Sequence, residues 1–290
     1  MRNKALIYII LSGIFWGTSA IFANMLSPFG FSSLQMTAMR GVVAAVVMCA
    51  YIFLKDRTLF RVKPSHFLLF ALGGLFTFLS AFFYYDSIKR ASVSVAVMLM
   101  YTSPVFVMAY SVAFLGEKFT LKKAVSIVCV LVGCALISGI FGGVEFNLMG
   151  VIMGLMAGVC YSAYNIVAKI QMDKGCNPLS STVYGFMFMG LFALLSADIP
   201  GIFELASANP PVTYPLMIGI GIFTVALPYF LYTASLKYIP VGTAAILGMI
   251  EPMTATILGV ALFGDSITVV SCVGIILILA AVFILAKEKN

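Results

Sequence analysis

The sequence predicts an all-α integral membrane protein with ten transmembrane helices in two inverted five-helix repeats. First, 62% of the 290 residues are hydrophobic and only 9% are charged, whereas soluble domains contain about 25% charged residues. Second, the apolar stretches reach the roughly 20 residues that a helix needs to cross a bilayer, and a helix satisfies its own backbone hydrogen bonds there. Third, the second half of the chain repeats the first at a fixed offset.

Hydropathy, with breaks at prolines, glycines and clusters of charge, places helices along the whole chain. The connections between them are short, so we expect no separate soluble domain. The first helix is too long and too aromatic for the core of a signal peptide, so we expect it to be retained. The predicted helices lie near residues 4–25, 31–54, 66–86, 91–114, 121–140, 148–169, 179–197, 213–235, 240–263 and 267–286.

The distribution of Lys and Arg predicts the orientation. If successive connections alternate between the two sides, 14 of the 17 Lys and Arg residues lie in connections or at span ends on one side. The other side receives only Lys89 and Arg90, and Arg40 lies inside a span. Basic residues favour the cytoplasmic side, so both termini are expected there, in a multi-pass protein of the inner or plasma membrane. The basic residues behind the net charge of +7 then set the orientation and contact anionic lipid headgroups, so no nucleic-acid partner is expected.

The internal repeat is clearest in the second part of each half. At one fixed offset, residues 82–89 align with residues 230–237 without a gap. Matching prolines, glycines and acids do not follow from shared hydrophobicity, so they indicate duplication. The same register pairs Pro104 with Pro252, Gly116 with Gly264, and Glu117 with Asp265.

The first helix of each half agrees more weakly and at a shorter offset, with Gly13-x-x-Trp16-Gly17 against Gly154-x-x-Ala157-Gly158. The two repeats are expected at residues 1–145 and 146–290. Because each contains an odd number of helices, the second enters the membrane from the opposite side. Inverted repeats that rock about a site near the midplane are a recurring solution to alternating access, so the pattern favours a transporter.

Several motifs are spread over the whole chain: Gly13-Ile14-Phe15-Trp16-Gly17, Arg40, Tyr101-Thr102-Ser103-Pro104 leading to Gly116-Glu117-Lys118, and Glu251-Pro252 leading to Phe263-Gly264-Asp265. Together they resemble the EamA-type transporters of the drug/metabolite transporter (DMT) superfamily. The resemblance implies ten helices in two inverted repeats, a central cavity, and export or exchange of amino acids, metabolites or drugs. Asp265 departs from the family, which usually has Glu there, but it conserves the acid.

Arg40 and Glu251 are the two ionisable side chains well inside apolar spans, where a charge costs at least about 2.5–3.5 kcal/mol. Both are expected near the midplane or on its outer side, so they could meet. Arg40 either braces helix packing and reaches the interface, or binds a carboxylate or phosphate. Glu251 either makes a packing hydrogen bond, or binds a substrate ammonium or a coupling proton, since a carboxylate removed from water can titrate near neutral pH. Together they suit a zwitterion.

Pro104 and Pro252 lack the backbone N–H that an interior helix residue donates. They leave the carbonyls of Met100 and Gly248 free and are predicted to kink two transmembrane helices. The kinks are either static or act as hinges.

Four further residues are candidate substrate contacts: Trp16, Tyr101, Tyr164 and Asn165. Tyr164 and Asn165 share a helix face with Tyr161. An aromatic pocket would accept organic cations or aromatic solutes, and the alternative is that these side chains pack between helices or lie at the membrane interface.

No motif for catalysis, a cofactor or a metal is present. The sequence contains no G-x-x-x-x-G-K-[ST], no H-E-x-x-H and no paired Cys/His cluster. The six cysteines are expected to be packing residues. We therefore expect no enzyme activity, and transport that is driven by a gradient or by exchange with a proton or counter-substrate.

The leading hypothesis is a secondary transporter that exports or exchanges a small polar or zwitterionic metabolite, such as an amino acid, around Arg40 and Glu251. The alternative within transport is an exporter of organic cations or drugs with an aromatic-lined cavity. A membrane scaffold or sensor is the alternative outside transport, because a fold does not determine a function.

Overall fold

The computed structural model describes residues 2–91, 93–138, 147–264 and 268–287. The first half contains α1 (Arg2–Gly17), α2 (Ser19–Leu26), η1 (Ser27–Phe29), α3 (Ser33–Lys55), η2 (Arg57–Phe60), α4 (Pro64–Arg90), α5 (Val93–Met100), α6 (Ser103–Phe114) and α7 (Leu121–Ser138). The second half contains α8 (Leu148–Asp173), α9 (Pro178–Leu194), α10 (Ile199–Ala208), α11 (Pro210–Gly221), η4 (Ile222–Ala226), α12 (Leu227–Ser235), α13 (Val241–Gly248), α14 (Glu251–Phe263) and α15 (Val269–Ala286).

The predicted all-α membrane fold is confirmed. Within the described residues no strand occurs, and nine continuous or consecutive helical segments are long and apolar enough to cross a membrane. Together α9 and α10, which are bent by 95°, make a tenth when they are counted as one span. On the apolar helix α15, the exposed side chains of Val269, Ile276 and Phe283 lie two turns apart on one face, so this face is expected to contact lipid.

Capping side chains satisfy free backbone amides at the starts of several helices. At α3 the Ser32 hydroxyl accepts from the Gln35 backbone N–H at 3.2 Å, and the Gln35 side chain accepts from the Ser32 N–H at 2.9 Å. This reciprocal arrangement satisfies two of the free amides at a helix start. At the starts of α8 and α9, the side chains of Asn147 and Asn177 each accept one hydrogen bond from a backbone N–H of the first turn.

Two predicted spans are broken in the structure. Residues 91–114 were expected to form one kinked helix, but α5 ends at Met100 and α6 begins at Ser103. Residues 240–263 behave in the same way, with α13 ending at Gly248 and α14 beginning at Glu251. Each pair still forms one membrane span, so the predicted departure from regular helix at the two prolines is confirmed, as a two-residue interruption of the helix. A proline one residue into each second segment fits a helix start, where its missing N–H costs nothing.

Three other spans also differ from their expected form. The helix near 4–25 is divided at Thr18 into α1 and α2, and the helix near 213–235 contains the π-helical turn η4. This turn ends two residues before Pro228, which cannot donate to the carbonyl of Thr224 within the turn. After α9 the chain bends by 95° into α10, which the sequence analysis placed in a connection.

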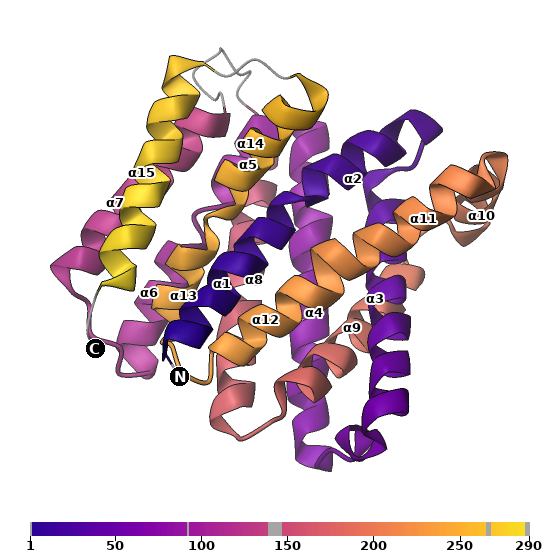
Figure 1. Cartoon of the computed structure of the whole chain (residues 1–290), viewed down its shortest axis with the longest axis horizontal. Coiled ribbons are helices and arrows are strands. Elements are labelled where there is room, and N and C mark those ends of the chain that lie inside the picture. The colour runs from indigo at the N-terminus through magenta and orange to yellow at the C-terminus, as the bar shows by residue number, and fades with distance from the viewer. Residues whose placement is uncertain (1, 92, 139–146, 265–267, 288–290) are drawn as a thin grey trace.

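The two repeats pack against one another through glycines. The last helices of the two halves, α7 and α15, lie side by side (Figure 1). A Cβ atom built on Gly133 would lie 2.8 Å from the Gly274 carbonyl oxygen, and one built on Gly274 would lie 2.7 Å from the Gly133 carbonyl oxygen. Any larger residue at either position would therefore push these helices apart.

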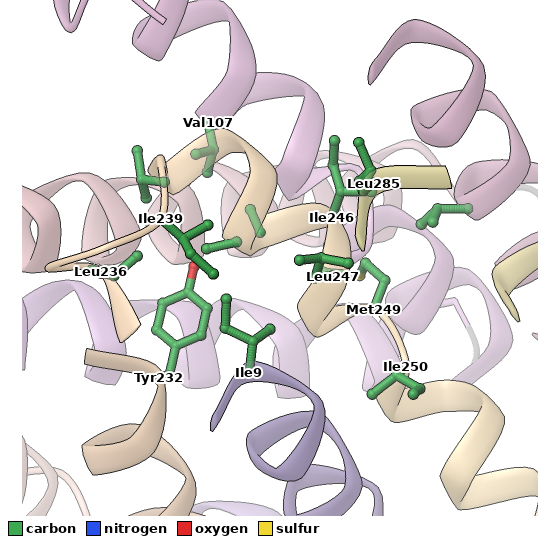
Figure 2. Close-up of a cluster of buried hydrophobic side chains, with 14 of the residues drawn as sticks. Ile9, Val107, Tyr232, Leu236, Ile239, Ile246, Leu247, Met249, Ile250 and Leu285 are labelled. Atoms are coloured by element: carbon green, nitrogen blue, oxygen red, sulfur yellow. The ribbon is translucent and has the colours of Figure 1, made fainter. Parts of the chain in front are cut away.

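One buried apolar cluster joins α1, α12 and α13 (Figure 2). In it Ile9 of α1 lies beside Tyr232 of α12 and near Ile246 and Leu247 of α13. All four side chains are almost completely buried. This cluster anchors the first helix of one repeat to the broken span of the other.

The start of α1 and the end of α15 lie at the same end of the molecule (Figure 1). This arrangement agrees with an even number of membrane crossings. The expected boundary between residues 145 and 146, and Asp265 of the repeated acid pair, lie outside the described residues.

Candidate functional site

The first helix of each repeat packs against the broken span of the other repeat. A Cβ atom built on Gly17 of α1 would lie 2.9 Å from the Glu251 carbonyl oxygen. One built on Gly13 would lie 3.1 Å from the carbonyl oxygen of Gly248, the group that Pro252 leaves free. The glycines of the Gly-x-x-Trp-Gly motif thus let α1 approach the break between α13 and α14 (Figure 1).

The second repeat uses the same device. A Cβ atom built on Gly158 of α8 would lie 3.0 Å from the Leu99 carbonyl oxygen and 3.3 Å from that of Met100. The carbonyl that Pro104 leaves free therefore faces a glycine of α8, as the carbonyl of Gly248 faces a glycine of α1. The glycines that align between α1 and α8 therefore have the same role, since in each repeat they let the first helix approach the broken span of the other repeat.

Glu251 and Tyr101 bring the two breaks together. Glu251 is the first residue of α14, and Tyr101 lies in the break between α5 and α6. The Tyr101 hydroxyl donates a hydrogen bond to the Glu251 carboxylate. A hydrogen bond to a charged group is roughly twice as strong as a neutral one. The broken spans of both repeats are therefore connected at the acidic side chain.

Arg40 of α3 is a further charged side chain near Glu251. Its guanidinium is near enough to interact electrostatically with the Glu251 carboxylate and with the hydroxyls of Tyr84 and Tyr229. Among the described residues the direct ion pairs join other partners. The Nε atom of Arg40 is buried and has no hydrogen-bond partner in the protein. The two opposite charges thus interact electrostatically but are not among the direct ion pairs of the described residues.

Aromatic rings surround this region. The centroid of the Trp16 indole lies 5.1 Å from the Tyr229 ring, 5.4 Å from the Tyr232 ring and 6.5 Å from the Tyr161 ring. Tyr164 continues the cluster, 5.2 Å from Tyr229. The Trp16 Nε1 atom is buried without an acceptor, a costly arrangement unless another group approaches.

The structure brings Trp16, Tyr101 and Tyr164 into one region, and it places Asn165 at the edge of that region. The Asn165 side chain is 1% exposed, and its Nδ2 atom donates to the Tyr161 carbonyl oxygen at 2.8 Å. Its Oδ1 atom has no hydrogen-bond partner in the protein. Half of this amide is therefore used within α8, and the other half can accept one donor.

Comparison with known proteins identifies the chain. The family model of the EamA-like transporter family matches residues 3–139 and 148–287. The chain belongs to the EamA-like transporter family. It is therefore a multi-pass membrane transporter, as its motifs predicted.

Individual relatives of this transporter are distant but cover most of it. An uncharacterized transporter of Archaeoglobus fulgidus is 28% identical over 284 residues, covering 97% of this chain and 95% of the relative. The threonine/homoserine exporter RhtA of Escherichia coli is 24% identical over 267 residues, covering 85% of this chain and 79% of the relative. A protein of known crystal structure has a TM-score of 0.81 and 18% identity, covering 98% of this chain and 96% of that one, so it shares the fold.

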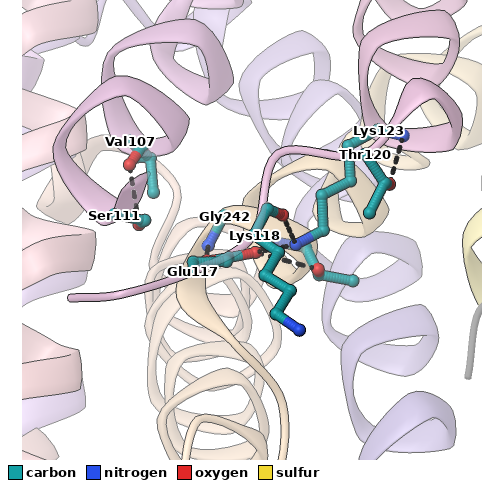
Figure 3. Close-up of polar contacts among 8 residues, drawn as sticks. Val107, Ser111, Glu117, Lys118, Thr120, Lys123 and Gly242 are labelled. Carbon is teal, nitrogen blue, oxygen red and sulfur yellow. Dashed lines mark hydrogen bonds and ion pairs between the residues drawn. The ribbon is translucent and has the colours of Figure 1, made fainter. Parts of the chain in front are cut away.

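Sequence reasoning treated Glu117 as a scaffold acid and missed its partners. Its carboxylate accepts from the backbone N–H groups of Gly242 and Thr243 at 3.0 and 3.2 Å, and from the Lys123 Nζ atom at 2.8 Å (Figure 3). The transporter thus caps α13 of its second half with an acid from its first half. One signal was present in the sequence. Helix α13 starts after Pro240, whose side chain cannot cap it, so an acceptor has to come from elsewhere in the protein.

Proposed function

We propose that this transporter exports a small zwitterionic metabolite, such as an amino acid, by alternating access around Arg40 and Glu251. The observation that carries the proposal is a pair of opposite charges in apolar spans that interact electrostatically but are not among the direct ion pairs of the described residues. Such charges are costly in a membrane, and intramembrane ionisable groups usually mark a substrate or ion pathway.

A zwitterion satisfies both groups at once. Its carboxylate would accept from the guanidinium of Arg40, whose Nε atom lacks a partner, and guanidinium binds carboxylate with two parallel hydrogen bonds. Its ammonium would lie against the Glu251 carboxylate. The side chain would lie among Trp16, Tyr101 and Tyr164. The relative RhtA, named as a threonine/homoserine exporter, is consistent with a substrate of this kind.

Competition at Glu251 would couple transport to a proton gradient. The carboxylate can hold either the substrate ammonium or a proton, but not both. If the site opens to the outside, the substrate leaves and a proton enters, and the proton is released on the inner side when the next substrate binds. The breaks at Pro104 and Pro252 are the proposed hinges, because no helix hydrogen bond to Met100 or Gly248 resists bending there.

The test is flux of a panel of labelled amino acids in proteoliposomes with an imposed pH gradient. Arg40→Gln and Glu251→Gln are each expected to abolish gradient-driven flux, and Glu251→Gln to remove its pH dependence. Lys55→Gln and Asp56→Asn are the matched controls, since both side chains are exposed at the end of α3, about four helical turns beyond Arg40. Absence of flux for every amino acid under every gradient would contradict the proposal.

A second candidate is export of organic cations, and the aromatic cluster at Trp16 favours it. Cations bind the faces of Trp and Tyr rings, and the Tyr229, Tyr232 and Tyr161 rings lie within 6.5 Å of the indole. Here Glu251 is the counter-charge and Arg40 only braces the helices. Quaternary ammonium compounds would then compete with transport, and Arg40→Gln would leave it intact.

A further inference from the structure

A cavity separate from Arg40 and Glu251 lies between the two repeats. Its volume is about 620 Å³, and it is lined by the α6–α7 connection, the first turn of α7, the end of α8 and the α12–α13 connection. It lies near the end of the molecule where α1 begins (Figure 1). This is the end that the distribution of Lys and Arg predicts to be cytoplasmic.

The lining of this cavity is strongly basic. It includes four lysines and one acid, namely Lys118, Lys123, Lys169, Lys237 and Glu117. Two lysines already have partners within the protein. Lys123 pairs with Glu117 at 2.8 Å (Figure 3), and Lys169 pairs with Asp173 at 2.7 Å.

Lys118 and Lys237 have no such partner. Their side chains are exposed, and the ion pairs found among the described residues do not include them. Lys118 belongs to the first repeat and Lys237 to the second. The cavity therefore keeps two positive charges, one from each repeat, that remain available to a ligand.

The position of the cavity restricts the ligand. The connections that line it follow directly on membrane-spanning helices, so they lie at the depth of the lipid headgroups. Basic pockets between transmembrane helices on the cytoplasmic side bind phosphate-bearing headgroups. The exposed ring of Tyr238, beside Lys237 in the lining, is typical of this interfacial layer.

We propose that this cavity binds a phosphate-bearing anion between Lys118 and Lys237. The anion is either the headgroup of an anionic phospholipid or a free phosphate compound of the cytoplasm. Because the two lysines come from different repeats, the bound anion ties the repeats together at this end of the molecule. It stabilises the arrangement in which Glu117 caps α13 and opposes its opening.

The experiment measures thermal unfolding of the purified full-length protein in two arms. The first arm adds inorganic phosphate in a neutral detergent, against sodium chloride of the same ionic strength. The second arm uses phosphatidylcholine nanodiscs with and without phosphatidylglycerol. The variant is Lys118→Gln/Lys237→Gln, with Lys237→Glu as a second variant. The matched control, Lys55→Gln/Lys63→Gln, removes the same charge from the α3–α4 connection.

In at least one arm, the anion is expected to raise the midpoint temperature of the wild type and of the control variant, with saturation as the concentration rises. Both pocket variants are expected to lose this increase. A response to inorganic phosphate identifies a free anion, and a response to phosphatidylglycerol alone identifies a lipid. The proposal is overturned if neither anion stabilises the wild type, or if the pocket variants respond as strongly as the control.

Discussion

Replacing Glu117 by Gln should weaken the connection between the two repeats. The carboxylate is buried, with 5% of its side chain exposed, and it neutralises Lys123, whose side chain is 3% exposed. It also accepts from the Gly242 and Thr243 amides at the start of α13. The amide of Gln keeps one acceptor oxygen for α13 but carries no charge.

The size of the effect follows from what remains buried. In the variant the Lys123 ammonium keeps the Lys118 carbonyl at 2.7 Å as an acceptor, but it loses its counter-charge. Removing one partner of a buried ion pair costs about 3–5 kcal/mol. A lost helix cap costs about 1 kcal/mol, and Gln retains part of that. We therefore expect a loss of about 3 kcal/mol in unfolding free energy, at the lower end of the range for a buried pair.

The assay is reversible unfolding in mixed micelles of sodium dodecyl sulfate, followed by fluorescence. The protein has one tryptophan. Trp16 of the first repeat packs against Tyr229 and Tyr232 of the second, so its emission reports the packing between the repeats. Asp86→Asn is the control. It breaks an ion pair whose side chains are 48% and 25% exposed, and exposed pairs contribute only about 0.2–1 kcal/mol.

A second substitution tests the mechanism. Adding Lys123→Met to Glu117→Gln removes the uncompensated charge, and a buried pair replaced by apolar residues is often neutral. The double variant should recover most of the stability and remain about 1 kcal/mol below the wild type, because part of the cap is lost. If Glu117→Gln is no worse than Asp86→Asn, or if Lys123→Met makes it worse, the buried pair does not hold the repeats together.

Three further predictions concern the site. Gly17→Ala should destabilise the protein by about 1–3 kcal/mol, because the new Cβ would lie 2.9 Å from the Glu251 carbonyl oxygen. The control Gly185→Ala adds a Cβ in open space and should not destabilise the protein; equal unfolding midpoints for the two variants would refute the prediction. Tyr101→Phe removes the hydrogen bond to Glu251 and should lower transport efficiency about tenfold, since 1.4 kcal/mol is a factor of ten; unchanged flux would show that the bond has no role in transport. Pro252→Ala restores a donor for the Gly248 carbonyl and should slow turnover while substrate affinity, measured by equilibrium binding, stays the same; an unchanged turnover number would argue against a hinge.

The repeat and the fold class could be read from the chain itself because both depend on local composition. Apolar stretches near the length of a bilayer predict spans whatever their neighbours are. Pro104 and Pro252 marked the correct places for a departure from regular helix. The prolines could not show what packs against each break, because Gly158 and Gly17 provide that fit only in the folded protein.

The candidate site was partly predictable for a similar reason. Arg40 and Glu251 stood out because a charge inside an apolar span is costly wherever the helices lie. Tyr101 could be named as an aromatic residue before a proline, but its hydrogen bond to Glu251 joins residues from different repeats. Glu117 gave no such signal, since an acid in a connection is ordinary until α13 is seen to start beside it.

The sequence by itself determined that this protein crosses the membrane many times, that its halves are duplicated, and that Arg40 and Glu251 lie inside apolar spans. Hydrophobicity, repetition and charge act along the chain, so they are visible there. Tertiary structure alone decided that each first helix packs against the break in the opposite repeat, that Glu251 interacts with both Arg40 and Tyr101, and that Glu117 caps a helix of the other half. Those contacts join residues far apart in the chain, and only the packing of helices brings such residues together.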